Sequence, residues 1–223
     1  MIYNVELNQE RLMNYNKLAY ITPPRAEQAI PKSFLSIWEG EGWIAQVKKN
    51  GTNTVIFVDP DKNMTFMSRH GTELKAWSPT TSSTKIFKDL PDDKWYVFNA
   101  ELMNNKTKNV KDTLYIFDIL VYHDQYLLGT TYSQRYKLMM NMFLTGKEQC
   151  VESHFVLNNN AWLARNIASD FSSVFKKLKN DEDEGLVLKN PNGQLTFDKN
   201  DEWMVKCRRT QGNDGKFNKS YSF

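Results

Sequence analysis

The sequence predicts an α+β fold in which antiparallel sheets are flanked by helices. Three observations lead to this prediction: short β-branched and aromatic runs, turn-forming residues between them, and two later stretches with helical features. Short runs of this kind, bounded by Asn, Gly, Pro and Asp, are typical of strands joined by tight turns. The 223 residues suffice for one large domain with a buried core.

The first 40 residues are expected to form a helix and a Pro-rich loop that pack on the core. The helix is predicted at LNQERLMNYNKLAYI, residues 7–21. Prolines at positions 23, 24 and 31 then exclude regular structure, because proline fixes φ and lacks a backbone N–H group.

Residues 41–209 are expected to form the main domain, which opens with five strands. Asn-Gly, Asp-Pro-Asp, Pro-Asp-Asp and Lys-Thr-Lys-Asn turns separate these strands, so a largely antiparallel sheet is expected. The predicted strands are GWIAQVKK at 42–49, NTVIFVD at 53–59, MTFMSR at 64–69, KWYVFNAELM at 94–103 and TLYIFDIL at 113–120.

Two helices are predicted next. Thr131 and Gln134 make a capping box that opens a helix at 131–144. A second helix is predicted at 161–179, because apolar residues there recur at spacings of three and four. Three further strands are predicted at 185–191, 194–199 and 203–209, followed by a polar tail at 210–223.

Composition excludes several classes of protein. No apolar run is long enough for a membrane span, and the N-terminus does not resemble a secretory signal, so a cytoplasmic, intracellular protein is expected. Two cysteines and three histidines without paired spacing argue against a disulfide framework or a structural zinc site. The net charge of +3 is compatible with a nucleic-acid partner but does not require one.

Strand alternation predicts which side chains share a face. In the strand at 42–49, Lys48 shares a face with Gln46, whereas Lys49 is expected to bend out to solvent at the strand end. In the last strand, Lys206 and Arg208 share a face. Taken singly, each of these residues is better explained by an ordinary solvated strand face.

Taken in order, six motifs resemble those of the covalent nucleotidyltransferase superfamily, which comprises ATP-dependent DNA ligases, RNA ligases and mRNA capping enzymes. Each motif alone is weak, but their order and separations are specific. They are Lys-x-Asn-Gly-Thr-Asn at 48–53, MSRHG at 67–71, NAELM at 99–103, LYIFDIL at 114–120, DEGLVLK at 183–189 and WMVKCRR at 203–209. The resemblance implies an ATP-grasp-like adenylation domain without a following OB-fold domain.

By this resemblance, Lys48 attacks the α-phosphate of ATP and carries AMP before passing it to a 5′-phosphate end. An ordinary lysine is almost fully protonated at neutral pH, and freeing its lone pair costs about 4 to 5 kcal/mol. Lys189, Lys206 and Arg208 are therefore expected to lower the pKa of Lys48 by like-charge repulsion and to neutralise phosphate charge.

The resemblance also implies the remaining site residues. Arg69 and Glu101 would hold the ribose, and Glu184 would bind Mg²⁺ or Mn²⁺, which prefer carboxylate oxygen. Phe117 would stack on adenine, although a Phe in a central strand is as often plain core, and Glu184 is also explained as one of several solvated acids. The other nucleotide-binding positions are Gln46, Val47, Asn53 and Lys189.

The nature of the substrate stays open at this point. Asn50 and Asn53 depart from the Lys-x-Asp-Gly-x-Arg form of DNA ligases and favour RNA ends slightly, whereas the FDIL segment favours DNA ligases. In an alternative alignment, Met204 takes the first lysine position of the last motif. The expected partner is nucleic acid, with an accessory protein as a further candidate. A GTP-dependent capping guanylyltransferase and a non-catalytic nucleic-acid-binding module remain alternatives.

Overall fold

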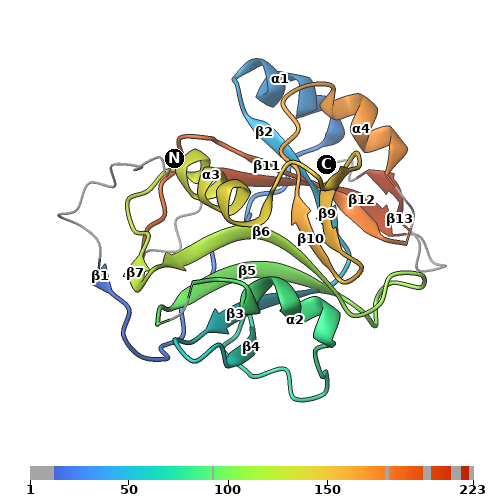
Figure 1. Ribbon diagram of the computed structural model, residues 1–223. Coiled ribbons are helices and arrows are strands. Elements are labelled where there is room, and N and C mark those ends of the chain that lie inside the picture. The colour runs from blue at the N-terminus through green and yellow to red at the C-terminus, as the bar shows by residue number, and fades with distance from the viewer. Residues whose placement is uncertain (1–12, 92, 179–180, 198–201, 212–216, 221–223) are drawn as a thin grey trace.

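The computed structural model describes residues 13–91, 93–178, 181–197, 202–211 and 217–220. Within these ranges the chain forms two sheets with helices packed against them (Figure 1), which confirms the predicted α+β class. The helices are the 3₁₀ turn η2 Lys32–Phe34, α1 Leu35–Gly40, α2 Thr81–Lys88, α3 Tyr132–Phe143 and α4 Phe171–Lys177. Among the described residues, no helix is long and apolar enough to cross a membrane.

The larger sheet has nine strands. Its main path runs in the order β4 Met64–Ser68, β3 Thr52–Val58, β5 Tyr96–Met103, β6 Thr113–Tyr122, β10 Ala161–Ala164, β9 His154–Asn158 and β8 Gln149–Cys150. Two short strands, β1 Met13–Asn14 and β7 Gln125–Tyr126, extend it beside β6. Of the described strand pairs, β10 with β6 is parallel and the others are antiparallel.

The smaller sheet has four strands, in the order β13 Phe217–Ser220, β12 Met204–Gln211, β11 Asp183–Lys189 and β2 Ile44–Lys49. Helices α1 and α4 cover its outer face, at the top of Figure 1, through Leu35, Phe171 and Phe175. Strand β11, near the end of the chain, therefore pairs with β2, the first of the predicted strands. Residues separated by more than 130 positions become neighbours in this pair.

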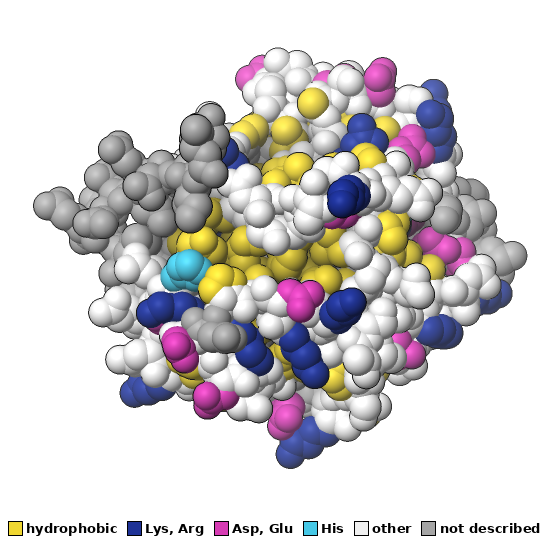
Figure 2. Space-filling view, in the orientation of Figure 1, with side chains coloured by type: hydrophobic (Ala, Val, Ile, Leu, Met, Phe, Trp, Pro, Cys, Tyr) yellow, Lys and Arg dark blue, Asp and Glu magenta, His cyan; other side chains and the backbone are white. Residues whose placement is uncertain are grey.

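The main core lies on the nine-stranded sheet and includes Phe57, Phe98, Ile116 and Leu120, which are at most 1% exposed. Helix α2 adds Phe87 to this core at the bottom of Figure 1. Figure 2 shows a band of hydrophobic side chains over the middle of this sheet, bordered by Lys, Arg, Asp and Glu. Strands β5 and β6 are buried on both faces, so the β-branched and aromatic runs read from the sequence mark the strands that build the core.

Several predicted elements agree with the structure. The first five predicted strands correspond to β2 to β6, and those at 185–191 and 203–209 correspond to β11 and β12. Helix α3 begins after the capping box of Thr131 and Gln134, in which both reciprocal hydrogen bonds are present. These elements carry strong local signals, either strict alternation between turn residues or a side-chain cap.

The helix predicted at 7–21 is wrong from residue 13 onward, and residues 7–12 lie outside the described ranges. Met13 and Asn14 form β1, which pairs with β7, and residues 15–21 contain no helix. Residues 13 and 14 lie at an edge of the larger sheet, where their backbone groups pair with the distant strand β7. Tertiary pairing overrides local helical preference here.

The helix predicted at 161–179 is wrong in its first half. Residues 161–164 form β10, which pairs with both β6 and β9, and α4 begins only after Asp170, whose φ is +63°. Ala161 and Leu163 are fully buried with Trp162 between them, so the apolar run follows a period of two. A short apolar run does not by itself distinguish a strand from a helix.

Two other predictions near the C-terminus differ from the structure. Residues 194–197 form no strand, because Gln194 makes only an isolated bridge to Thr131, and residues 198–199 lie outside the described ranges. The expected tail at 210–223 contains the end of β12 and all of β13, which pairs with β12. Helices α1 and α2 were not predicted, since Ser and Thr dominate the first turns of α2 and resemble a loop.

Candidate active site

Two rows of residues cross the four-stranded sheet and line a cleft of about 520 Å³ between the sheets. In the first row, Gly185 of β11 lies between Lys48 of β2 and Arg208 of β12. In the second row, Val187 lies between Gln46 and Lys206. The predicted convergence of Lys48, Lys206 and Arg208 is therefore a consequence of strand register.

Gly185 makes this convergence possible. Its φ is +152°, and a Cβ atom there would lie 2.0 Å from the Cys207 carbonyl oxygen. The register shifts between Asp183 and Gly185, so the strand bulges at Glu184. The missing side chain and the bulge let Glu184 reach Lys48.

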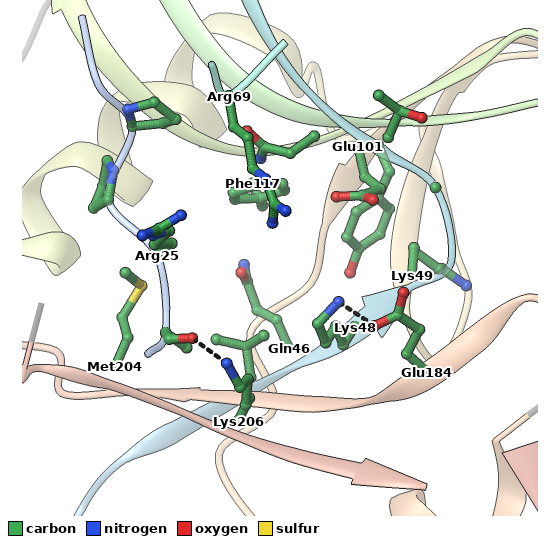
Figure 3. Close-up of a pocket in the computed structure, with 18 of the residues that line it drawn as sticks. Arg25, Gln46, Lys48, Lys49, Arg69, Glu101, Phe117, Glu184, Met204 and Lys206 are labelled. Atoms are coloured by element: carbon green, nitrogen blue, oxygen red, sulfur yellow. Dashed lines mark hydrogen bonds and ion pairs between the residues drawn. The ribbon is translucent and has the colours of Figure 1, made fainter. Parts of the chain in front are cut away.

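Lys48 forms an ion pair with Glu184, whose carboxylate also lies 3.4 Å from Arg208 Nε. Figure 3 shows the Lys48 amine and the Glu184 carboxylate joined at one end of the cleft, with Glu101 nearby. The Lys48 side chain is 19% exposed, so it faces the cleft and not bulk water.

Glu101 approaches from the other sheet because of Gly51. A Cβ atom at Gly51 would lie 2.5 Å from the Leu102 carbonyl oxygen and 2.7 Å from Glu101 Cγ. Only glycine therefore lets the turn after Lys48 pack directly on β5. Desolvation raises the pKa of Glu101 to about 7; Lys48 opposes this rise and the Glu184 charge adds to it.

Lys206 lies at the centre of a cationic group. Burial lowers its pKa first, and the positive charges of Arg208, Lys48 and Arg25 lower it further, whereas Glu27 raises it. Its Nζ donates a hydrogen bond of 2.9 Å to the Ala26 carbonyl oxygen. Such a group of cations favours polyanions, because phosphate charges neutralise it.

The other end of the cleft is formed by a network around Gln46. The Gln46 amide nitrogen donates to Tyr132 Oη at 2.8 Å and to Asn166 Oδ1 at 2.9 Å. Both amide hydrogens are therefore used, and no hydrogen bond among the described residues uses Gln46 Oε1. These two hydrogen bonds fix the orientation of the Gln46 side chain, and its Oε1 atom is available to accept a hydrogen bond from a ligand.

Phe117 and Lys189 complete this end. Phe117 is partly exposed and lines the cleft, so it is not plain core. Lys189 is 2% exposed; its Nζ lies 3.2 Å from the Phe117 carbonyl oxygen and 4.1 Å from the Tyr132 ring centre. Burial lowers the pKa of Lys189 to about 7, with Asp118 opposing the shift and Arg135 adding to it.

The expected place of Lys189 in the cationic group around Lys48 is therefore wrong. Its charged neighbours are Asp118 and Arg135, not Lys48. Two positions separate Lys189 from Val187, which is paired with Gln46, so Lys189 is displaced along β11 toward the Phe117 end. The cations beside Lys48 are Lys206 and Arg208.

All eleven residues singled out from the sequence line the cleft: Gln46, Val47, Lys48, Asn53, Arg69, Glu101, Phe117, Glu184, Lys189, Lys206 and Arg208. Val47 is 3% exposed and also belongs to the core of the smaller sheet. Asn53 Nδ2 donates to Asn99 Oδ1 at 2.9 Å, and Arg69 Nε lies 3.1 Å from His70 Nε2. Met204, the alternative position in the last motif, lines the cleft as well.

Sequence reasoning missed other cleft residues, above all a strap formed by residues 23–27. The strap is held to β12 by hydrogen bonds from Lys206 N to the Gln28 carbonyl and from Ile30 N to the Lys206 carbonyl, both 2.9 Å. It brings Arg25 to the cleft, opposite Arg69 in Figure 3. The prolines at 23 and 24 predicted an irregular segment, but they did not predict that this segment would lie beside β12. Lys106, His70 and Tyr115 also line the cleft.

A divalent cation is compatible with the carboxylates present. Glu101 and Glu184 interact across the cleft, and the Glu184 charge contributes to the raised pKa of Glu101. Mg²⁺ is commonly held by one or two carboxylates together with substrate phosphates. The described residues contain no group of three or more His, Cys, Asp or Glu that could hold a metal by themselves. The donor set therefore fits a cation that arrives with a phosphorylated substrate.

The prediction that Lys49 bends out to solvent is wrong. Its side chain is 2% exposed, although the residue belongs to the lining of the cleft. The amine lies 2.8 Å from Asp183 Oδ1 and stands over the rings of Tyr115 and Trp162, at 5.7 and 5.8 Å. A distant acid and two aromatic rings compensate its desolvation, and these partners were not visible in the local sequence.

We expect Lys49→Met to lower the free energy of unfolding by about 3 kcal/mol, because it removes the cation from a buried ion pair with Asp183. Urea denaturation monitored by circular dichroism would measure the change.

The matched control is Lys94→Met, which breaks the exposed pair of Lys94 with Asp124 and should cost less than about 1 kcal/mol. Equal losses for Lys49→Met and Lys94→Met would show that the buried pair does not stabilise this sheet.

Glu101 generates a pH-dependent prediction. Its pKa is about 7 in the folded chain and 4.5 ordinarily, so between these values the native state binds a proton that the unfolded state lacks. The wild type should therefore lose roughly 1 to 3 kcal/mol of stability through this group as pH rises from 5 to 7. Urea denaturation at pH 5, 6 and 7 would measure this loss.

Glu101→Gln should remove this dependence, whereas Glu152→Gln, at a half-exposed position, should keep it. Parallel pH profiles for the wild type and Glu101→Gln would contradict the assignment.

Comparison with known families adds independent information. The profile of the family described as ATP-dependent DNA ligase domain matches residues 99–208, just under half of the chain. This range includes the motifs that contain Glu101, Phe117, Glu184 and Lys206. No curated protein sequence matches the chain.

Several solved structures share the fold. The ligase domain of M. tuberculosis LigD has a TM-score of 0.58 at 17% identity, covering 85% of this chain and 59% of that one. Mycobacterial DNA ligase D complexed with ATP and MES gives 0.56 at 17% identity, covering 83% and 59%. Pmar-Lig_PreS3 gives 0.57 at 14% identity, covering 86% and 47%. The chain thus spans less than two thirds of each of these proteins.

At such identities the structural likeness shows the fold, whereas the family profile concerns the sequence itself. Residues 99–208, which the profile matches, supply most of β5, all of β6 and β11, and most of β12 around the cleft. The chain thus has the fold of these ligase domains, and its residues 99–208 match the ATP-dependent DNA ligase domain family.

Proposed function

We propose that the protein is an ATP-dependent polynucleotide ligase that joins 5′-phosphate and 3′-hydroxyl ends through a covalent lysyl-AMP intermediate on Lys48. The observation that carries the proposal is the row of Lys48, Gly185 and Arg208 beside Lys206, in a cleft that also holds two carboxylates. An amine beside two other cations is suited to attack on a phosphate and to the charge that develops there.

In the first step, the ion pair between Lys48 and Glu184 opens. Lys206 and Arg208 then disfavour the ammonium form of Lys48, and the amine loses its proton to solvent. The Nζ lone pair forms a bond to the α-phosphorus of ATP, the bond to the β-phosphate oxygen breaks, and pyrophosphate leaves. A divalent cation held by Glu184, with Glu101 nearby, would supply charge neutralisation for the triphosphate.

Two further transfers complete the reaction. An oxygen of the 5′-phosphate attacks the phosphorus of lysyl-AMP, the P–N bond breaks, and the amine regains a proton. The 3′-hydroxyl then attacks the 5′-phosphate, loses its proton, and displaces AMP. Lys206 and Arg208 are proposed to bind phosphate oxygens in each step, since both line the cleft beside Lys48.

Gln46 supports ATP over GTP as the nucleotide. Its amide hydrogens are held by Tyr132 and Asn166, so Oε1 is the atom available to a base. Adenine presents an amino donor at the position where guanine presents a carbonyl acceptor, and an acceptor facing another acceptor is unfavourable. Phe117 offers the ring face on which the base would stack.

The substrate strand has two candidates. The family profile is that of a DNA ligase domain, which favours nicked duplex DNA. Asn53, at the position where the DNA-ligase form of the first motif has arginine, favours RNA; its amide is bonded to Asn99. The proposal therefore concerns 5′-phosphorylated ends in duplexes of either kind, with an accessory protein as a candidate aid in gripping them.

We expect purified wild-type protein to become covalently labelled by ATP carrying a labelled α-phosphate in the presence of Mg²⁺. Lys48→Ala should lose this labelling by at least a thousandfold, because the nucleophile is absent. Denaturing gel electrophoresis followed by peptide mapping would measure the label and locate it.

The control variant is Lys94→Ala, on the surface away from the cleft, which should label like the wild type. Labelling that persists in Lys48→Ala would overturn the proposal. Stronger labelling by GTP than by ATP would select the capping guanylyltransferase instead, and salt-sensitive nucleic-acid binding without any label would select a non-catalytic module.

A single sealing assay would distinguish the candidate strands. We expect the protein to seal a nicked duplex, and the rates with nicked DNA, nicked RNA and single-stranded RNA decide between DNA and RNA. Sealing of nicked DNA at least tenfold faster than nicked RNA would assign DNA, and the reverse ratio would assign RNA. Labelling without sealing of any of the three would remove the end-joining part of the proposal.

A further inference from the structure

The loop between β5 and β6, residues 104–112, lies at the right of Figure 1 and carries three exposed lysines, Lys106, Lys108 and Lys111. We propose that this lysine loop binds the backbone phosphates of the nucleic-acid strand whose 5′-phosphate enters the cleft. The inference rests on the proposed function and names the surface on which its substrate lies.

The cleft has two distinct ends, which fixes the side from which a strand arrives. Gln46, which is held by the buried Tyr132, and Phe117 form the end suited to a flat base. Lys48, Glu101 and Glu184 form the other end, where the reacting phosphate would lie. A strand that delivers its 5′-phosphate to Lys48 must therefore leave the cleft past this second end.

The lysine loop is attached to the second end. Lys106 Nζ donates a hydrogen bond to the carbonyl oxygen of Gly51, three residues after Lys48. Asn50 Nδ2 donates to the Lys106 carbonyl oxygen at 3.2 Å. Lys106 also lines the cleft, and its charge opposes the rise in the pKa of Glu101. The lysine loop therefore extends from the Lys48 end of the cleft to the surface of the protein.

The loop is also preorganised. Thr107 is 1% exposed and its hydroxyl donates to the Val110 carbonyl oxygen. Lys111 Nζ donates to the carbonyl oxygens of Asn104 at 2.7 Å and Thr107 at 2.6 Å. Because these contacts hold the backbone, little further conformational entropy is lost when a ligand binds.

The charge of the loop matches a polyanion. Its single acid, Asp112, accepts a hydrogen bond of 2.9 Å from Trp77 Nε1 at the far end of the loop. Lys108 is exposed and makes no hydrogen bond or ion pair with any residue that the structure describes. Lysines that contact a phosphodiester backbone release its counterions, and this makes binding both favourable and dependent on salt.

The lysine loop could bind either the phosphates of a nucleic-acid backbone or the triphosphate of ATP, and the test distinguishes these two ligands. The binding of a fluorescent nicked duplex with a 5′-phosphate at the nick would be measured by anisotropy at several salt concentrations, with DNA and RNA duplexes. We expect Lys108→Glu to raise Kd about tenfold and Lys108→Ala about threefold. Each should also reduce the slope of log K against log salt by about one.

The matched control is Lys85→Glu on α2, which is also an exposed lysine without a described partner and lies outside the cleft. It should change Kd less than twofold. Circular dichroism would establish that each variant is folded. The Michaelis constant for ATP in self-adenylylation, measured without nucleic acid, should be unchanged by Lys108→Glu.

Two outcomes would overturn the inference. One is an equal effect of Lys108→Glu and Lys85→Glu on both duplexes; the other is a raised Michaelis constant for ATP, which would assign the loop to the triphosphate. The anisotropy measurement does not require a covalent intermediate. Failure of the wild type to become labelled would thus refute the proposed function while the test of the loop still gives a result.

Discussion

The site depends on the register between β2 and β11, which brings Lys48 opposite Gly185 and against Glu184. The lack of a side chain at Gly185 lets the Cys207 carbonyl approach, and the bulge before it turns Glu184 toward the amine. On the other side of β2, the buried pair of Lys49 and Asp183 fixes the same register. A slip by one residue would exchange Lys48 and Lys49 between the cleft and the core.

The cleft brings cationic and acidic side chains close together. Lys206 and Arg208 lie beside Lys48, whereas Glu184 and Glu101 lie close enough to balance them. Lys48 is paired with Glu184, and this ion pair must open before the amine can react. Burial is the main cause of both the lowered pKa of Lys206 and the raised pKa of Glu101. A phosphate group would compensate the charges of Lys206 and Arg208, and a divalent cation would compensate those of Glu184 and Glu101.

Both ends of the cleft are held by residues outside the motifs. Tyr132 and Asn166 lock Gln46 at the base end, and the strap at 23–27 holds Lys206 through the Ala26 carbonyl. The lysine loop continues the phosphate end toward the surface. These supports come from α3, from the start of the chain and from the β5–β6 connection, so most of the fold contributes to the geometry of the cleft.

The sequence by itself determined the α+β class, most strands and helix α3, because period-two alternation, turn residues and a capping box are local signals. The eleven predicted site residues, all of which line the cleft, were instead implied by the resemblance of six motifs to the covalent nucleotidyltransferase superfamily. Only the tertiary structure decided that Lys49 is buried on Asp183, that Lys189 lies beneath Phe117, and that residues 161–164 pair with β6. Alternation states which side chains share a face, but not which distant element that face meets. Charge partners and strand neighbours from remote parts of the chain are fixed only when the two sheets pack.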